Sequence, residues 1–168
     1  MERRQLAKTG MLRSAHMLGN EEEIIFTATD LLADTKLAPE LSNEAHYYRA
    51  KAYLDAGKTD GAMEDLKILA KDTRNVYGAE AKYKVAQIYF DGGQTDKAEQ
   101  EVLNYIEVST PHTYWLARSF VLLADVYMKV GRNLDAKQYL LSLKQNYQAD
   151  DDIAGMIESR LEKLKTEN

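Results

Sequence analysis

The chain has 168 residues, of which 45% are hydrophobic and 29% are charged, and its formal net charge at pH 7 is −5. This composition predicts one soluble domain with enough apolar residues to bury a core. The acidic balance argues against a general nucleic-acid binder, which carries a basic face, and against attraction to an anionic membrane surface. The absence of cysteine excludes disulfides, thiolate catalysis and cysteine–zinc sites.

Residues 1–18 are predicted to form a first helix with Gly10 near its middle. A glycine there costs about 1 kcal/mol relative to alanine. The basic residues Arg3 and Arg4 are not followed by the apolar run of about 7–15 residues that a signal peptide needs. The segment also lacks the polar outer face of a terminal repeat. This favours the end of a longer array, in which case a secretion signal could lie upstream.

Residues 21–36 are predicted to form a second helix, which Asn20 caps and whose three first-turn glutamates suit the helix dipole. Pro39 breaks the chain before the next helix, and Thr110-Pro111 is a helix-start sequence. Six further helices are expected at residues 43–56, 60–72, 76–91, 96–108, 112–130 and 134–146. The helix at 112–130 is the most hydrophobic and is expected at the centre of the core.

After Tyr147 the pattern changes to a terminal helix at residues 150–165. It begins with three aspartates and then carries apolar residues along one face, while its other face is charged. This is typical of the solvating helix that closes a helical stack.

The helix pairs share one pattern, centred on a turn glycine that recurs 36 and then 38 residues further on. Alanine recurs seven residues before and five residues after each glycine, and tyrosine recurs four residues before it. The residues are Gly57, Gly93 and Gly131; Ala50, Ala86 and Ala124; Ala62, Ala98 and Ala136; and Tyr53, Tyr89 and Tyr127. A degenerate copy surrounds Gly19. Four copies with a period of about 20–50 residues are typical of a solenoid.

Each part of the pattern has a physical role. Glycine just past a helix end adopts positive φ without a Cβ penalty. Two residues later come the expected N-caps of the following helix, Thr59, Thr95 and Asn133. The paired alanines let the two helices approach closely, and the three tyrosines are expected in the core.

This pattern resembles the tetratricopeptide repeat (TPR) over about residues 4–147. The units are longer than the family period of about 34 residues, so the chain is most similar to the C-terminal end of long bacterial TPR arrays. The resemblance implies an all-α fold, a right-handed α–α superhelix in a single domain spanning residues 1–168. Its four repeats would cover about residues 4–36, 43–72, 76–108 and 111–147, with the capping helix at 150–165.

The resemblance also implies a non-enzymatic scaffold that binds a peptide or protein segment on the concave face of the solenoid. In similar repeats the groove is lined by positions ten, six and three residues before the turn glycine. These candidates are Tyr47, Lys51, Leu54, Tyr83, Gln87, Phe90, Val121, Asp125 and Met128. Aromatic residues are good interface anchors. The alternative is that these side chains only pack between neighbouring helices.

The best-known site of the family is a clamp for the two carboxylates of chaperone C-termini, and it needs lysine, asparagine and arginine in this strip. The sequence offers one lysine there, Lys51. We therefore predict that chaperone tails do not bind.

The sequence carries no catalytic constellation, and no cofactor or metal is expected. Motifs for phosphate loops, dinucleotide binding, zinc proteases and serine hydrolases are absent. The three histidines lie in separate elements: His16, His46, expected at the core or its rim, and His112, expected at a solvated helix end. The three aspartates at residues 150–152 lack the spacing of a calcium loop.

Two alternatives to groove binding stay open. The chain could be a structural end-piece that self-associates through its N-terminal repeat, or a helper domain of an enzyme. The partner is expected to be a protein or peptide rather than nucleic acid, without direct insertion into a membrane. A cytoplasmic setting and a bacterial cell envelope both fit the composition.

Overall fold

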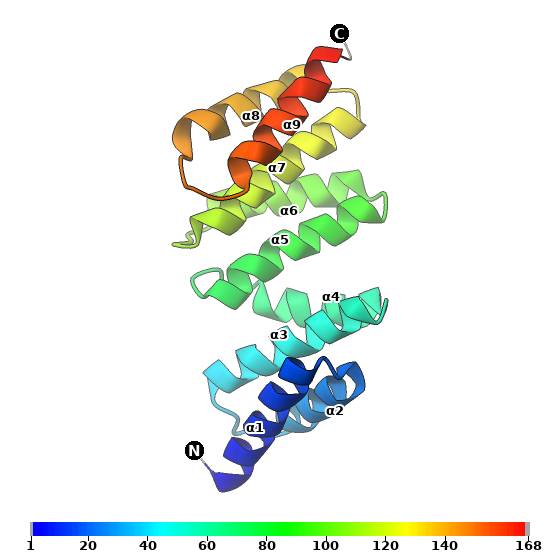
Figure 1. The fold of residues 1–168 in the computed structure, drawn as a ribbon, viewed down its shortest axis with the longest axis vertical. Coiled ribbons are helices and arrows are strands. Elements are labelled where there is room, and N and C mark those ends of the chain that lie inside the picture. The colour runs from blue at the N-terminus through cyan, green and yellow to red at the C-terminus, as the bar shows by residue number, and fades with distance from the viewer. Residues whose placement is uncertain (1, 167–168) are drawn as a thin grey trace. The chain divides into compact units, whose positions relative to one another are not determined.

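The computed structural model describes residues 2–166, which form nine α-helices and no β-strand. The predicted all-α helical-repeat fold is confirmed (Figure 1). The helices are α1 (Arg3–Leu18), α2 (Glu21–Leu32), α3 (Pro39–Asp55), α4 (Thr59–Leu69), α5 (Val76–Asp91), α6 (Thr95–Glu107), α7 (Thr113–Lys129), α8 (Asn133–Asn146) and α9 (Ile153–Thr166).

The chain divides into two compact units, residues 1–72 and 73–168. The N-terminal unit holds α1 to α4, in which α3 packs against α1, α2 and α4. The C-terminal unit holds α5 to α9, in which α7 packs against α5, α6, α8 and α9. Within each unit successive helices pack as hairpins, and α9 lies against α7 and α8 (Figure 1). The expectation of a single domain concerns how the two units join, and it stays a prediction.

The four turn glycines close their helices as the sequence predicts. Their φ angles are 67°, 73°, 77° and 81° at Gly19, Gly57, Gly93 and Gly131. The backbone N–H of the next residue donates to the carbonyl five residues back, at 2.7–3.0 Å in all four turns. This is the Schellman motif, and it needs the left-handed conformation that glycine adopts without penalty.

The expected N-caps at Thr59, Thr95 and Asn133 are wrong by one residue. Each is the first residue of its helix, and the N-cap is the residue that completes the Schellman motif, with no side-chain cap hydrogen bond. The turn is therefore shorter than expected. Asn20 does cap α2, because its side chain accepts a hydrogen bond from the Glu23 N–H at 3.1 Å.

Two proline-containing starts also differ from expectation. Pro39 is the first residue of α3 rather than a break before it, which suits proline because the first helical N–H has no partner inside the helix. Thr110 lies before α7 instead of capping it. Its hydroxyl accepts from the His112 N–H and donates to the Thr73 carbonyl, so it fastens the preceding turn.

In the N-terminal unit, a cluster of small apolar residues joins the first three helices. Its buried members are Leu12, Ala15, Ile24, Ala28, Leu31, Ala45 and Ala52. Four of the seven are alanine, so the helices approach closely and bury little side-chain volume at this seam.

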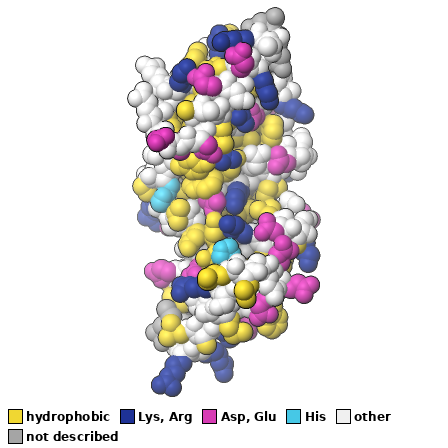
Figure 2. Space-filling model, viewed as in Figure 1, with side chains coloured by type: hydrophobic (Ala, Val, Ile, Leu, Met, Phe, Trp, Pro, Cys, Tyr) yellow, Lys and Arg dark blue, Asp and Glu magenta, His cyan; other side chains and the backbone are white. Residues whose placement is uncertain are grey.

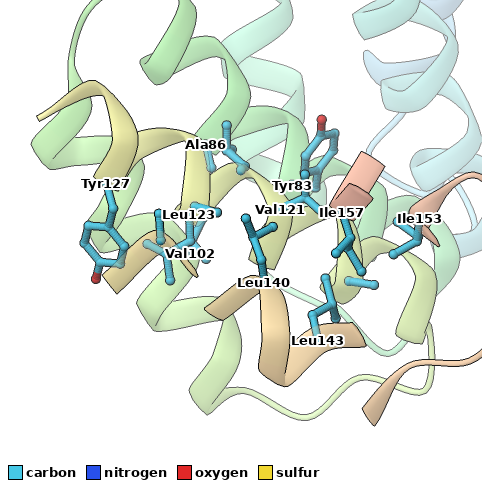
Figure 3. Close-up of a cluster of buried hydrophobic side chains, with 14 of the residues drawn as sticks. Tyr83, Ala86, Val102, Val121, Leu123, Tyr127, Leu140, Leu143, Ile153 and Ile157 are labelled. Carbon is cyan, nitrogen blue, oxygen red and sulfur yellow. The ribbon is translucent and has the colours of Figure 1, made fainter. Parts of the chain in front are cut away.

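In the C-terminal unit, a larger cluster of fifteen buried residues surrounds α7 (Figure 3). Leu122, Leu123 and Leu140 are at most 2% exposed. Helix α7 contributes more members than any other helix of this cluster, which fits the expectation that it forms the centre of the core. Of the three repeat tyrosines, only Tyr127 is buried, whereas Tyr53 and Tyr89 are half-buried.

Candidate functional site

Three of the predicted groove residues lie on α3 in the N-terminal unit, and all three are half-buried. The Lys51 ammonium lies 5.3 Å from the centre of the Tyr47 ring, and the Tyr47 ring lies 5.7 Å from that of Tyr48. Tyr48 in turn stacks on His16 of α1 at 4.3 Å. Leu54 follows one turn after Lys51. The unit thus carries a partly exposed row of aromatic rings with one cation.

The other six predicted residues lie on α5 and α7 in the C-terminal unit. Tyr83 and Val121 are 6% and 3% exposed and belong to the core cluster. Phe90 and Met128 are partly buried and pack against the edge of that cluster. Gln87 and Asp125 are half-buried. A partner could therefore contact this strip only through its partly exposed residues.

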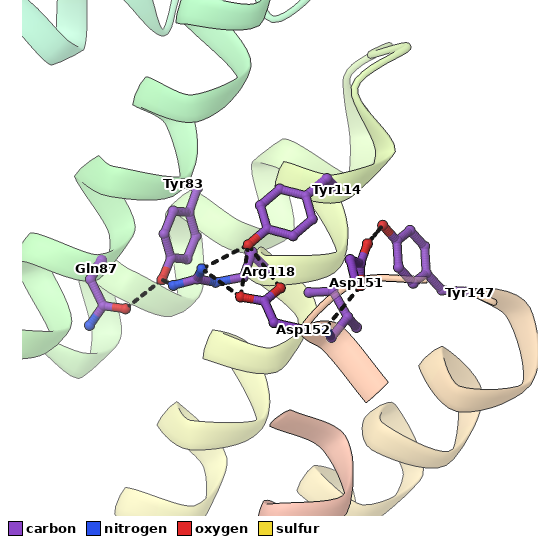
Figure 4. A network of polar contacts seen from close by, with 8 residues as sticks. Tyr83, Gln87, Tyr114, Arg118, Tyr147, Asp151 and Asp152 are labelled. Carbon is purple, nitrogen blue, oxygen red and sulfur yellow. Dashed lines mark hydrogen bonds and ion pairs between the residues drawn. The ribbon is translucent and has the colours of Figure 1, made fainter. Parts of the chain in front are cut away.

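A chain of hydrogen bonds links Tyr83 to neighbours that the sequence did not single out (Figure 4). The Tyr83 hydroxyl donates to Gln87 Oε1 at 2.9 Å and accepts from Arg118 Nη2 at 2.9 Å. Arg118 Nη1 donates to the Tyr114 hydroxyl at 3.0 Å, and that hydroxyl donates to Asp152 Oδ1 at 3.0 Å. The chain joins α5, α7 and the segment before α9.

Aromatic rings surround the guanidinium of Arg118. Its central carbon lies 4.9 Å from the centre of the Tyr83 ring. The Trp115 ring lies 5.6 Å from Tyr83 and 5.0 Å from Tyr114, edge-on to the latter. The nearest ion-pair contact of Arg118 is long, at 3.9 Å to Asp152 Oδ2. Tyrosine hydroxyls and ring faces therefore hold this cation more closely than a carboxylate does.

Burial and the contact between Tyr83 and Arg118 determine the protonation states of these two side chains. Burial raises the pKa of Tyr83, and the nearby Arg118 charge only partly offsets that effect. Burial also opposes the charge of Arg118, but hydrogen bonding to Tyr114 and the neighbouring Tyr83 hold its pKa above the ordinary value. Near neutral pH, a neutral phenol thus faces a permanent guanidinium.

Asp125, expected to face the groove, is paired with α9. Arg160 donates to it twice, from Nε to Oδ1 at 2.7 Å and from Nη2 to Oδ2 at 2.9 Å. The two side chains are 25% and 24% exposed. This bidentate pair fastens α9 to α7.

A recurring register explains part of what the sequence reasoning missed. The position thirteen residues before the turn glycine is Glu44 in one repeat and Arg118 in another. Within each unit, this position bonds to the first helix of the preceding hairpin: Glu44 accepts from Arg13 of α1 at 2.7 and 2.9 Å, and Arg118 donates to Tyr83 of α5. A charged residue at this position in the sequence could have indicated the bond to the preceding hairpin.

A buried titratable cluster in the N-terminal unit has a structural role. Asp65 of α4 is 1% exposed and accepts from Arg49 at 2.7 and 2.9 Å, and His46 Nδ1 lies 2.7 Å from it. Arg49 Nη1 also donates to Thr29 of α2 at 3.1 Å. Burial opposes ionisation of Asp65, but the hydrogen bonds from His46 and Arg49 outweigh it and hold its pKa below the ordinary value.

Over residues 2–166, no three histidine, aspartate or glutamate side chains gather closely enough to hold a metal ion. In the same described part of the chain, no helix has the length and hydropathy required to cross a membrane.

One helix pair of the chain matches a known family. The family model of the tetratricopeptide repeat matches residues 44–72, which contain most of α3 and all of α4. Residues 44–72 therefore match one tetratricopeptide repeat. No sequence among the curated proteins matches the chain. The narrower resemblance to the C-terminal end of long bacterial TPR arrays stays a prediction.

Two similar solved structures are crystal structures of nearly identical TPR-like repeats of a kinesin light chain from Podosopora anserina, one of them a point variant. The variant has a TM-score of 0.60 at 16% identity, and the other has 0.58 at 17%. Each alignment covers 99% of this chain and 96% of the other. At these identities the likeness shows the fold alone. TPR solenoids generally serve protein–protein interaction through extended surfaces.

Proposed function

We propose that this chain is a non-enzymatic scaffold that binds a peptide or protein segment on the concave face of its TPR-like repeats. The observation that carries the proposal is the ordered row Gln87–Tyr83–Arg118–Tyr114, whose members are tied together by hydrogen bonds. Side chains that are already fixed lose little freedom when a partner binds. The half-exposed rings of Tyr114 and Trp115 supply the kind of apolar anchor that interfaces favour.

The internal pairing of the charges narrows the chemistry of the partner. Asp125 is paired with Arg160, and both terminal nitrogens of Arg118 donate to tyrosine hydroxyls. A partner would therefore gain affinity from apolar contact with the half-exposed rings more than from charge. Such binding changes little with salt, in contrast to a clamp of lysines.

The proposal is tested with peptides selected from a random-peptide phage library on the wild-type protein. Affinities are then measured by calorimetry for wild type, Gln87→Arg on the strip of the C-terminal unit, and Lys51→Glu on that of the N-terminal unit. Gln100→Arg and Lys71→Glu introduce the same changes at exposed positions outside the strip.

We expect at least one strip variant to lose about tenfold in affinity, or about 1.4 kcal/mol, while both controls bind as wild type does. Equal binding by all variants, or an equal loss in a control, would move the interface away from the concave strip and overturn the proposal.

Self-association through the N-terminal repeat is a second candidate. The observation that favours it is the exposure of four large apolar side chains on α1: Leu6, Met11, Met17 and Leu18. A scaffold and a self-associating piece are compatible, because the two use different surfaces.

A further inference from the structure

Three aromatic side chains meet at the edge of the core of the C-terminal unit, where α7 begins. Tyr114 and Trp115 are half-buried and pack against the core cluster, whereas Tyr83 of α5 belongs to it. The Trp115 ring lies 5.0 Å from the Tyr114 ring, edge-on, and 5.6 Å from the Tyr83 ring. Figure 2 shows hydrophobic side chains gathered at the surface over α5 and α7. We call Tyr83, Tyr114 and Trp115 the aromatic cluster.

The indole N–H of Trp115 is the unused polar group of this cluster. Both tyrosine hydroxyls take part in the hydrogen-bond chain through Arg118 (Figure 4). Within residues 2–166, by contrast, the indole N–H donates to no protein group, and it is not one of the buried polar atoms that lack a partner. It is therefore accessible to solvent. Since tryptophan has a donor and no acceptor, a ligand completes the cluster by supplying an acceptor.

The groups around the indole also offer donors. Arg118 has N–H groups and no acceptor, and its two terminal nitrogens donate to tyrosine hydroxyls at 3.0 and 2.9 Å. The acceptor beside Tyr83, Gln87 Oε1, is already occupied by the Tyr83 hydroxyl. A backbone N–H brought against these rings would lose its hydrogen bond to water without replacement, which weakens binding. The matching ligand therefore has carbonyl groups and few N–H groups.

We infer that the aromatic cluster binds a proline-rich segment in the polyproline II conformation. Proline has no backbone N–H, and polyproline II forms no internal hydrogen bonds, so its carbonyl groups are free to accept. One carbonyl accepts from the Trp115 indole N–H, and the flanking proline rings pack on Trp115 and Tyr114. Aromatic-lined grooves recognise such segments because this helix is already formed before binding.

Other peptide conformations satisfy the cluster less well. An α-helix bonds its carbonyl groups to its own N–H groups, so it would leave the indole N–H unpaired. An extended strand offers carbonyl groups but also brings N–H groups against the rings. A charged segment gains little, because the cation within the cluster, Arg118, is already held by two tyrosine hydroxyls.

This inference rests on the proposed function and names the partner class of the strip in the C-terminal unit. The probe is decaproline, and the comparison is an alanine-rich decapeptide, which keeps its backbone N–H groups. In calorimetry, decaproline should bind wild type at least about tenfold more tightly. Equal binding of the two peptides, or no binding of decaproline, would overturn the inference. The proposed function would still stand if peptides from the phage library bound the strip.

The hydrogen bond itself is observed by NMR, because the chain has a single tryptophan and gives one indole N–H signal. Decaproline should move this signal downfield in proportion to the bound fraction. Binding that leaves the indole signal in place would contradict the inference, whatever the affinity.

Trp115→Phe keeps an aromatic ring and removes the donor. Its affinity for decaproline should fall about tenfold, and thermal unfolding checks that the variant is folded. Tyr139→Phe removes a hydroxyl from another half-buried aromatic residue of the same unit and should bind as wild type does. An unchanged affinity in Trp115→Phe would refute the inference. If this variant does not fold, the indole signal of the wild type decides.

Discussion

The two units of this molecule repeat one sequence pattern but hold their helices together differently. In the C-terminal unit, α7 is surrounded by large apolar side chains such as Leu123 and Leu140, both fully buried. In the N-terminal unit, the seam between α1, α2 and α3 is mostly alanine, and a buried carboxylate, Asp65, ties α4 to Arg49 and His46 of α3. Repeats with the same glycine turns can therefore be held together either by apolar contacts or by buried polar contacts between their helices.

The largest loss of stability is expected when the buried carboxylate of Asp65 is removed. Asp65→Ala leaves Arg49 and His46 without their carboxylate, and breaking a buried pair from one side costs about 3–5 kcal/mol. Urea unfolding measures the loss, and hydrogen exchange should place it in α1 to α4. Glu64→Ala, which truncates the exposed neighbour, is the control. A loss below about 1 kcal/mol for Asp65→Ala would mean that the apolar seam alone holds this unit.

The matching change in the C-terminal unit is Leu140→Ala. This side chain is fully buried, so its loss should cost about 2–5 kcal/mol in urea unfolding. Leu141→Ala truncates the next residue, which is 45% exposed, and should cost about 0.5 kcal/mol or less. If the two variants were equally stable, buried apolar side chains would not be what stabilises the C-terminal unit.

The two units should also respond to opposite extremes of pH, beginning with alkali. Burial and the hydrogen bond to Glu99 raise the pKa of Tyr127 to about 12. The contribution of Tyr127 to the free energy of unfolding is fully present below the pKa of tyrosine in the unfolded chain, about 10. This contribution is lost as the pH rises towards 12. We expect a loss of about 1–2 kcal/mol over this range, measured by urea unfolding, and a smaller loss in Tyr127→Phe. An unchanged alkaline profile in that variant would assign the loss to other tyrosines, such as Tyr147.

In acid the N-terminal unit should loosen first. The pKa of Asp65 lies below its ordinary value, so its contribution is present above the unfolded pKa of about 3.9 and is lost as the pH falls through the folded value. Hydrogen exchange at decreasing pH should show α4 losing protection below about pH 4 before α7 does. Earlier loss in α7 would contradict the assignment.

The smallest expected effect concerns the last helix. Arg160→Gln breaks the pair with Asp125, which is about one quarter exposed, and should cost about 1 kcal/mol or less. Faster hydrogen exchange should be confined to α9. Lys163→Gln removes an exposed charge from the same helix and should have no such effect.

The sequence predicted the fold well because its strongest signals are local. A glycine that must adopt positive φ, such as Gly93, marks a helix end without reference to the rest of the chain. The caps were misplaced by one residue because the Schellman bond of Gln94 shortens the turn, and nothing in the residue types reports that.

The candidate site was harder to predict because its accessibility depends on long side chains from neighbouring helices. The repeat register placed Tyr83 on the groove face, but it did not show that Arg118 covers its ring. The same limit applies to Asp125, which the sequence left free and which Arg160 reaches from α9. Whether this strip holds a partner stays a prediction.

Trp115 has an optical consequence. It is the single tryptophan of the chain, and it lies in the C-terminal unit beside the rings of Tyr83 and Tyr114. Tryptophan fluorescence, excited at a wavelength that tyrosine does not absorb, therefore follows that unit alone, whereas far-ultraviolet circular dichroism follows the helices of both. Denaturation curves from the two signals that do not coincide would show, without any label, that the units melt separately.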